Sequence, residues 1–81
     1  MKKKILLTGA AGSVGEEALN HLLARSEAFD IRVLELPTKK THRILKKYRG
    51  LDIVYGDLRN KQDVARAVTG IDVVILSLIH I

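Results

Sequence analysis

Three glycines spaced three residues apart carry the clearest chemical signal in this sequence. Gly9, Gly12 and Gly15 follow a short apolar run and precede a segment whose apolar residues recur at helical spacing, so they occupy a strand-to-helix turn. In such a turn the first glycine permits a sharp bend, the second leaves the backbone open to close approach, and the third lets the helix pack against the sheet. The following amides point from a helix N-terminus, where the dipole favours an anion. We expect a pyrophosphate-binding loop; the alternative is an ordinary glycine turn. Its expected contact residues are Gly9, Ala11, Gly12, Ser13, Val14 and Gly15.

Two carboxylates occur at spacings that suit a dinucleotide. Glu35 lies twenty residues beyond Gly15, where an acid accepts hydrogen bonds from the adenosine ribose. Asp57 follows a later apolar run and could accept from the adenine amino group, with Leu58 against the ring. Each acid also has a simpler interpretation: Glu35 as a solvated residue at a strand end, and Asp57 as a turn-forming residue after Gly56.

The elements that must position these residues alternate between strands and helices. We expect four strands, over residues 4–8, 31–35, 51–55 and 71–76. We expect three helices, the first from Val14 to about Ala28, the second from its cap Thr41 to Gly50, and the third from its cap Asn60 to Gly70. Strands separated by such helices run parallel with right-handed crossovers. The sequence therefore predicts the α/β class, a Rossmann-like doubly wound parallel sheet of strand order 3-2-1-4 that stops after the fourth strand.

Composition narrows the function classes. The chain has 81 residues, of which 47% are hydrophobic but only 4% aromatic, so the core must be aliphatic. The absence of cysteine excludes disulfides and Cys-based metal sites. Neither His21 nor His42 has a partner at ligand spacing, so we expect no metal site. No apolar run approaches the ~18–20 residues of a membrane span, and we expect a cytoplasmic protein without a membrane partner.

The net charge of +5 raises the question of a nucleic-acid partner. The basic residues fall into three groups, Lys2 to Lys4, Lys39 with Lys40, and Arg43 to Arg49. Only one aromatic residue, Tyr48, is interleaved with them, and a single ring does not form a platform on which successive bases stack. We therefore interpret them as a capped strand start and a solvated helix face, and expect no nucleic-acid partner; a basic interaction protein is the third functional hypothesis.

Several segments resemble the extended short-chain dehydrogenase/reductase family, in its NAD-dependent epimerase/dehydratase group. The matching segments, in family order and spacing, are residues 7–15, 32–37, 55–59 and 64–75. The resemblance implies that the glycine loop lines the pyrophosphate, that Glu35 takes the ribose where NAD users usually have Asp, and that Asp57 and Leu58 contact adenine. Lys39, Lys40 and Arg43 could bind a 2′-phosphate, but Glu35 repels one, so we expect NAD first and NADP second.

The resemblance also implies what this chain lacks. Family members transform nucleotide sugars, steroids or other hydroxyl and carbonyl substrates by hydride transfer. Their catalytic Ser or Thr and Tyr-x-x-x-Lys pair lie downstream of a strand like residues 71–76, and Tyr48 is followed four places on by Asp52, not Lys. We therefore expect this chain to be the cofactor-binding N-terminal part of an epimerase/dehydratase-type oxidoreductase. We expect it to carry no catalytic residues and to be inactive by itself. We expect the parent protein to be a homodimer that acts on a small-molecule substrate. The alternative is a non-catalytic NAD(P)-sensing or binding module.

The last six residues depart from the family pattern. Leu76 to Ile81 read as the translation of CTG TCT CTT ATA CAC ATC, the transposon mosaic-end adaptor of sequencing libraries. We therefore expect residues 1–75 to be the N-terminal half of an NAD(P)-binding Rossmann domain, and residues 76–81 to be a non-native tail. The competing interpretation is a natural short protein with a divergent last strand.

Overall fold

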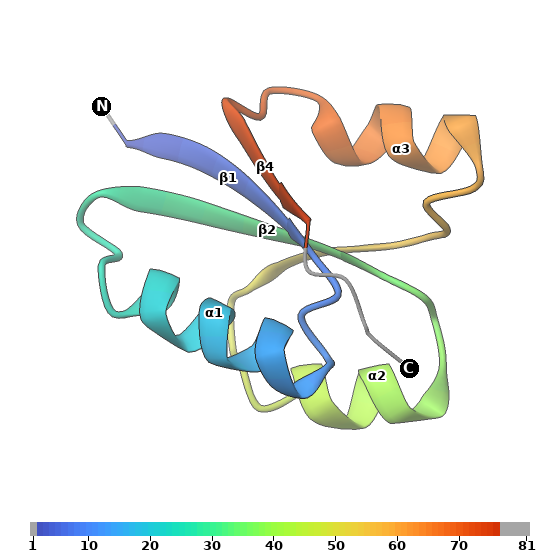
Figure 1. Cartoon of the computed structure of the whole chain (residues 1–81), viewed down its shortest axis with the longest axis horizontal. Coiled ribbons are helices and arrows are strands. Elements are labelled where there is room, and N and C mark those ends of the chain that lie inside the picture. Colours follow the sequence, from blue (N-terminus) through green and yellow to red (C-terminus); the bar gives the residue numbers. More distant parts are fainter. Residues whose placement is uncertain (1, 77–81) are drawn as a thin grey trace.

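The computed structural model describes residues 2–76, which form a parallel sheet covered by helices on both faces (Figure 1). The strands are β1 (Lys3–Thr8), β2 (Phe29–Glu35), β3 (Asp52–Tyr55) and β4 (Val73–Leu76). The helices are α1 (Ser13–Leu23), α2 (Lys39–Leu45) and α3 (Lys61–Val68). All three strand pairs are parallel and the order is β3-β2-β1-β4. The predicted fold class and strand order are therefore confirmed.

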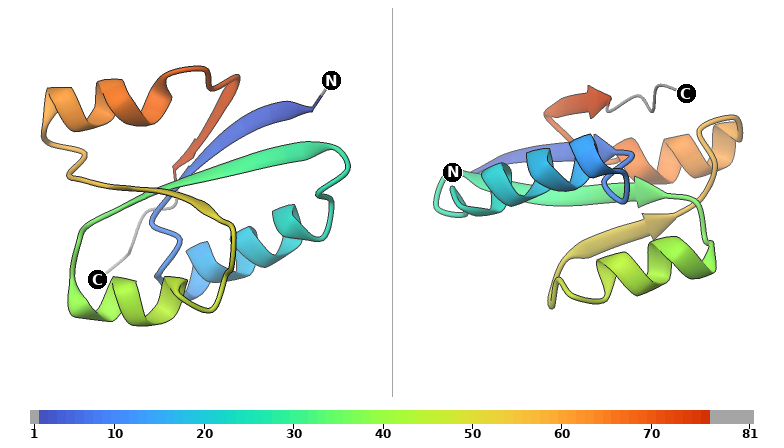
Figure 2. Two further views of the ribbon diagram at one scale, coloured as in Figure 1. Left: turned by 180° about the vertical axis from the view of Figure 1, so that it is seen from behind. Right: turned by 60° about the horizontal axis from the view of Figure 1, so that its bottom comes forward.

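The side chains of the sheet alternate between two apolar layers. Helices α1 and α2 cover one face and α3 covers the other (Figure 2). The buried residues of the first layer are Ile5, Leu7, Ala10, Leu19, Ile31, Val33 and Leu45. The buried residues of the second layer are Leu6, Leu34 and Ala67. Since both faces of β1 are buried, its continuous run of apolar residues is what a central parallel strand requires.

The first helix is shorter than the sequence predicts. It ends at Leu23 and not near Ala28, and residues 24–28 form turns in which the Ala28 amide donates to the Arg25 carbonyl. The cause is the register of β2, whose first residue, Phe29, lies opposite Lys3. The chain needs the intervening residues to reverse direction and reach that register, so tertiary pairing overrides the helical pattern.

The second helix begins three residues earlier than predicted. Its N-cap is Thr38, not Thr41. The Thr38 hydroxyl accepts from the Thr41 amide at 3.1 Å, and the Thr41 hydroxyl accepts from the Thr38 amide at 3.1 Å, a reciprocal capping box. The helix ends at Leu45, so Gly50 does not close it; this glycine, at φ +75°, lies in a later turn. The predicted cap of α3 is confirmed, since the Asn60 side chain accepts from two first-turn amides.

The Arg32 side chain links three elements, β2, β3 and α3. Its Nε donates to the Asp52 carboxylate at 2.8 Å, and its Nη1 donates to the Ala67 and Thr69 carbonyls at 2.9 and 2.8 Å. These carbonyls lie at the C-terminal end of α3, where helical carbonyls have no partner in the helix and the dipole favours a cation. Arg32 therefore fixes α3 over β2 and β3.

Strand β4 is an edge of this sheet in the described part of the chain and bonds to β1 alone. Three of its four side chains, those of Val73, Val74 and Leu76, are exposed by 45% to 60%. Such an apolar edge favours pairing between chains, so low solubility of the isolated chain stays a prediction. Within residues 2–76, no helix is long and apolar enough to cross a membrane.

The packing of α1 on β1 predicts that Gly15→Ala is strongly destabilising. A Cβ at Gly15 would overlap the Gly9 carbonyl, which is backbone and cannot rotate away. We expect a loss of about 1–3 kcal/mol in the free energy of unfolding, measured by urea denaturation. Gly50→Asn is the control, because this position has open space and Asn tolerates positive φ. Equal losses for the two variants would contradict the packing argument.

Candidate functional site

The carboxyl ends of the strands bring the predicted site residues to one edge of the sheet. The glycine loop leaves β1, Glu35 ends β2, and Asp57 lies two residues beyond the end of β3. Because the strands are parallel, their carboxyl ends share this edge (arrowheads in Figure 2, right). Ligands of open parallel sheets bind at such an edge.

The glycine loop is a tight turn that passes directly into α1. Gly9 has φ +72°, a left-handed conformation that favours glycine. The Gly12 amide donates to the Gly9 carbonyl at 3.2 Å, and the Gly12 carbonyl accepts from the Glu16 amide at 2.7 Å. Gly12 itself has φ −78° and ψ 164°, which any residue adopts. The backbone conformation of this position therefore does not require glycine.

Helix α1 begins without a side-chain cap. Gly12 occupies the N-cap position and offers no side-chain acceptor to the first-turn amides. The acid of the first turn, Glu16, is directed elsewhere and accepts from Lys47 at 2.8 Å and Tyr48 at 2.9 Å. Both hydrogen bonds lower the pKa of the Glu16 carboxyl, and the one from Lys47 has the larger effect. The exposed N-terminus at Ser13 is therefore suited to an external anion.

Glu35 contacts the glycine loop directly. Its Oε2 accepts from the Ala11 amide at 2.7 Å, a contact between residues 24 positions apart in sequence. The structure therefore brings together two site elements that the sequence predicted separately. The Ala11 amide serves this internal bond, which fixes the first half of the loop against the end of β2.

The segment after β3 is held by its own network. The Asp57 amide donates to Asp63 Oδ2 at 3.0 Å, and the Asp57 carboxylate accepts from the Arg59 amide at 2.8 Å and from its guanidinium at 2.7 Å. The side chain of Arg59, and next its backbone amide, lower the pKa of Asp57 to about 2. Leu58 is 54% exposed beside them. Asp57 is thus an ionised acceptor with its orientation fixed.

Sequence reasoning missed two positioning residues in this network. Asp63 lies in the first turn of α3 and accepts from the Asp57 amide. A Cβ at Gly56 would lie 2.8 Å from Asp63 Cβ, so the absence of a side chain there allows the close approach. The sequence feature that indicates this contact is a glycine seven residues before the acid in the first turn of the predicted third helix. Arg59 carried no signal beyond its charge.

Exposed apolar side chains border this edge. Four of the exposed large hydrophobic residues lie beside the site, namely Val14, Leu36, Leu58 and Leu76. Uncapped helical amides, oriented carboxylates and exposed apolar side chains together suit a ligand with a phosphate, polar hydroxyls and a flat ring. Among residues 2–76, no cluster of His, Asp and Glu could hold a metal ion.

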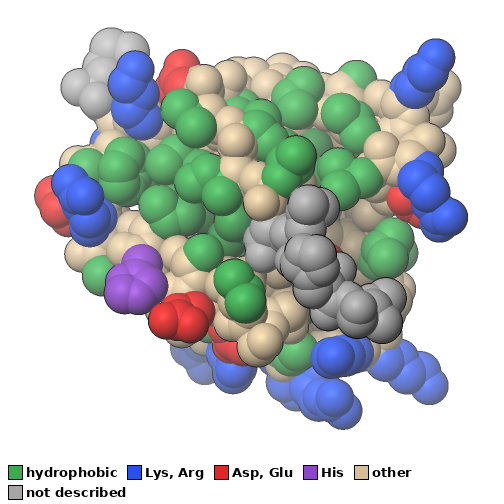
Figure 3. Space-filling view, viewed as in Figure 1, with side chains coloured by type: hydrophobic (Ala, Val, Ile, Leu, Met, Phe, Trp, Pro, Cys, Tyr) green, Lys and Arg blue, Asp and Glu red, His purple; other side chains and the backbone are tan. Residues whose placement is uncertain are grey.

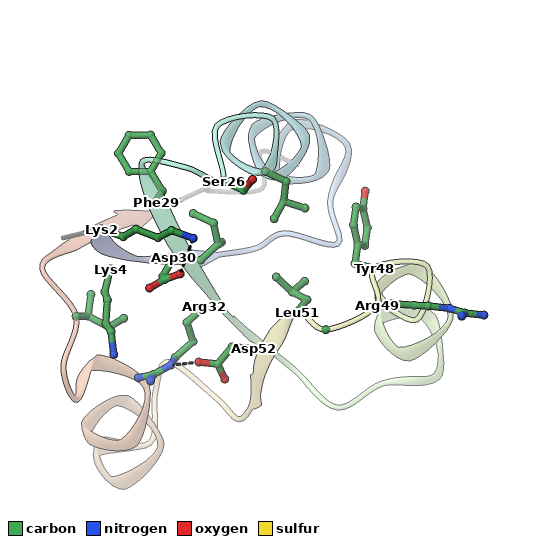
Figure 4. Close-up of a pocket in the computed structure, with 14 residues that line it drawn as sticks. Lys2, Lys4, Ser26, Phe29, Asp30, Arg32, Tyr48, Arg49, Leu51 and Asp52 are labelled. Carbon is green, nitrogen blue, oxygen red and sulfur yellow. Dashed lines mark hydrogen bonds and ion pairs between the residues drawn. The ribbon is translucent and has the colours of Figure 1, made fainter.

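A pocket of about 610 Å³ lies at the other end of the sheet, beside the amino ends of the strands (Figure 4). Two of its cations already have carboxylate partners: Lys2 lies 3.8 Å from Asp30, and Arg32 lies 2.8 Å from Asp52. This pocket is remote from the glycine loop and is not part of the candidate site.

Comparisons with known proteins agree with this chemistry. Residues 9–80 match the model of a family described as NAD(P)H-binding. A protein of Arabidopsis thaliana, described as uncharacterized and chloroplastic, is 38% identical over 73 residues. That match covers 89% of this chain but 21% of the plant protein, so the chain spans about a fifth of the length of this curated relative.

Solved structures share the fold. A Rossmann-fold NAD(P)-binding family protein from Shigella flexneri is 25% identical with a TM-score of 0.79, over 96% of this chain and 38% of its own. A short-chain dehydrogenase/reductase superfamily protein from Agrobacterium tumefaciens with bound NAD is 26% identical with a TM-score of 0.69, over 96% of this chain and 21% of its own. A short-chain dehydrogenase/reductase from Veillonella parvula in complex with NADP, 24% identical, has a TM-score of 0.73 over 94% of this chain and 35% of its own.

The contact between Asp57 and Arg59 predicts a measurable titration. Because the folded pKa of Asp57 is depressed to about 2, its carboxylate stays ionised across the pH range above that value. Its contribution to stability is present above the unfolded pKa and is lost as the pH falls through the folded one. We expect Arg59→Ala to return the midpoint toward ~3.9, measured by carbon-detected NMR of the side-chain carboxyl. Lys61→Ala is the matched control and should leave it unchanged; an unmoved midpoint in Arg59→Ala would exclude the pairing.

Proposed function

Because the chain belongs to the NAD(P)H-binding family and carries its cofactor-binding fold, we propose that the carboxyl edge of its sheet holds the ADP part of NAD(P). The observation that carries this proposal is the uncapped N-terminus of α1, which lies next to the Glu35 carboxylate. The residues proposed to form the cofactor site, by contact or by shaping the loop, are Gly9, Ala11, Gly12, Ser13, Val14, Gly15, Glu35, Asp57 and Leu58.

The pyrophosphate binds at the start of α1. The amides of Ser13 and Val14 donate to its oxygens, and the helix dipole stabilises the charge. Gly12 supports this role because its backbone conformation does not require glycine, whereas close approach of a phosphate does. Gly9 and Gly15 act indirectly, since they shape the turn and its packing.

The adenosine ribose binds to Glu35. A carboxylate has two oxygens with about four acceptor sites, and the Ala11 amide uses one oxygen, Oε2. The remaining sites can accept from the ribose hydroxyls while the loop stays in place. A 2′-phosphate would meet the same negative charge, so NAD is the preferred cofactor and NADP the second.

The adenine binds beside Asp57 and Leu58. The Asp57 carboxylate accepts from the adenine amino group, and the exposed Leu58 side chain packs against the ring. Arg59 supports this role because it keeps the acceptor ionised and oriented.

The protein to which this chain corresponds is proposed to be an oxidoreductase of the epimerase/dehydratase type, acting on a nucleotide sugar or another hydroxyl or carbonyl substrate. In that protein residues 1–75 supply cofactor binding and no catalytic residue, and the working form is a homodimer. The non-native tail, residues 76–81, stays a prediction: Leu76 ends β4, and residues 77–81 lie outside the described part. A cytoplasmic location likewise stays a prediction.

Gly12→Val tests the pyrophosphate site. Valine can adopt the backbone conformation at this position, so the fold should persist, while its side chain occupies the place of the phosphate. We expect at least a tenfold loss of NAD affinity by isothermal titration calorimetry, with an unchanged circular dichroism spectrum. Gly70→Asn, at a positive-φ turn after α3, is the control and should bind like the parent. Unchanged affinity in Gly12→Val would remove the loop from the site.

Glu35→Ala and Glu35→Gln test cofactor choice. A charge-assisted hydrogen bond contributes about 1.5–3 kcal/mol, so the loss of the charge should shift the NAD-to-NADP preference by at least tenfold toward NADP. Glutamine keeps an acceptor for the Ala11 amide, so a shift in both variants separates charge from loop damage. The ratio of the two dissociation constants is the readout, and a constant ratio would show that Glu35 is not the ribose acid.

A further inference from the structure

Helix α2 carries a stripe of basic side chains. Its members are Lys39, His42, Arg43 and Lys46, spaced so that they share one side of the helix, and all four are exposed. The buried side of α2 is formed by Thr41 and Leu45. In Figure 3, Lys and Arg side chains gather at the lower right, over α2. Lys39 and Arg43 belong to this stripe and could bind the 2′-phosphate of NADP, but the NAD site proposed above does not use them.

A groove of about 650 Å³ runs between the basic stripe and β3. The four residues of the stripe line one side, and the remaining lining residues are Leu45, Tyr48, Ile53 and Tyr55. No Asp or Glu lines this groove, and within residues 2–76 no ion pair joins a member of the stripe to a carboxylate. The groove therefore combines an apolar floor with uncompensated positive charge.

The other side of the groove is a sheet edge. Strand β3 pairs with β2 alone among the described strands. The Gly56 amide donates to the Glu35 carbonyl on the β2 side. Because backbone groups alternate along a strand, those of Ile53 and Tyr55 are turned toward the free edge. This edge offers donors and acceptors to an added strand.

We propose that this groove binds an acidic peptide in extended conformation, which adds to the edge of β3 as a further strand. The peptide backbone bonds to Ile53 and Tyr55, in the manner of β-strand addition. Every second side chain then faces α2, because side chains alternate along a strand. Glutamate or aspartate at those positions meets Lys39, Arg43 and Lys46, so the preferred ligand has acids at alternate residues.

The aromatic residues favour a peptide over a single-stranded nucleic acid. Nucleic-acid grooves need free ring faces on which bases stack. The Tyr55 ring is already in contact with the His42 ring, with centroids 4.3 Å apart and planes tilted by 36°. The Tyr48 ring packs against the core, and its hydroxyl lies 2.9 Å from Glu16. Free backbone groups and apolar side chains, in contrast, are what an added strand uses.

A fluorescent eight-residue peptide of alternating glutamate and valine tests the proposal by anisotropy with the 81-residue chain. We expect saturable binding that weakens at least tenfold in Arg43→Glu. Lys61→Glu is the matched control, because it changes the net charge equally on α3, outside the groove, and should bind like the parent. Lys46→Glu provides a second reading if circular dichroism shows that Arg43→Glu is misfolded. Equal losses in the stripe and control variants would overturn the proposal.

Two further probes separate strand addition from simple charge attraction. The same peptide with N-methyl groups on alternate amides keeps its charge but loses donors to β3, and we expect its binding to fall at least tenfold in one of the two methylation registers. An eight-residue oligothymidylate should bind more weakly than the peptide at equal ionic strength. Indifference to methylation in both registers, or tighter binding of the oligothymidylate, would overturn strand addition.

Discussion

The close approach of α1 to the carboxyl end of β1 is the constraint on which the site depends. No Cβ fits at Gly15 against the Gly9 carbonyl, and Gly9 has the left-handed conformation that turns the chain out of the strand. With these two residues only four residues separate the end of β1 from the start of α1, so the helix N-terminus is fixed at the carboxyl end of the strand. A helix displaced by a side chain at position 15 would carry its first-turn amides away from Glu35, and neither would then meet the same ligand.

The rest of the site is held by carboxylates that accept from backbone amides. Glu35 holds Ala11 across the β1–β2 pair, and Asp63 holds Asp57 between α3 and the loop after β3. Hydrogen bonds to charged groups are stronger than those between neutral groups. Both bonds join loops to regular elements, so the loop backbones are set before any ligand arrives. Preorganisation of this kind lowers the entropy cost of binding.

Sequence patterns predicted those parts of the fold that local chemistry decides. The strand order follows from strand–helix alternation, and the Asn60 cap follows from one side chain and the amides next to it. The errors arise where tertiary contacts choose between local alternatives. Thr38 and Thr41 can both cap a helix, and the buried position of Thr41 selects Thr38. The role of Asp63 depends on a contact with a loop that helical periodicity does not describe.

Charge is distributed unevenly over the molecule. The proposed anion-binding loop lies at the carboxyl ends of the strands, apart from the basic stripe beside β3. Residues 9–15 contain no cation, so a phosphate at this loop meets neutral amides and a helix dipole, while nearby Glu35 is negative. Amides discriminate by geometry, since they require oxygens at fixed positions, whereas exposed lysines attract any anion. Within residues 2–76 the cations of the basic stripe have no carboxylate partner, and they border a groove beside the edge of β3 that pairs with no described strand, where an added peptide would be oriented by backbone hydrogen bonds and selected by charge. At the glycine loop and at the edge of β3, backbone groups set the orientation of the proposed ligand, and the local charge determines which anion binds.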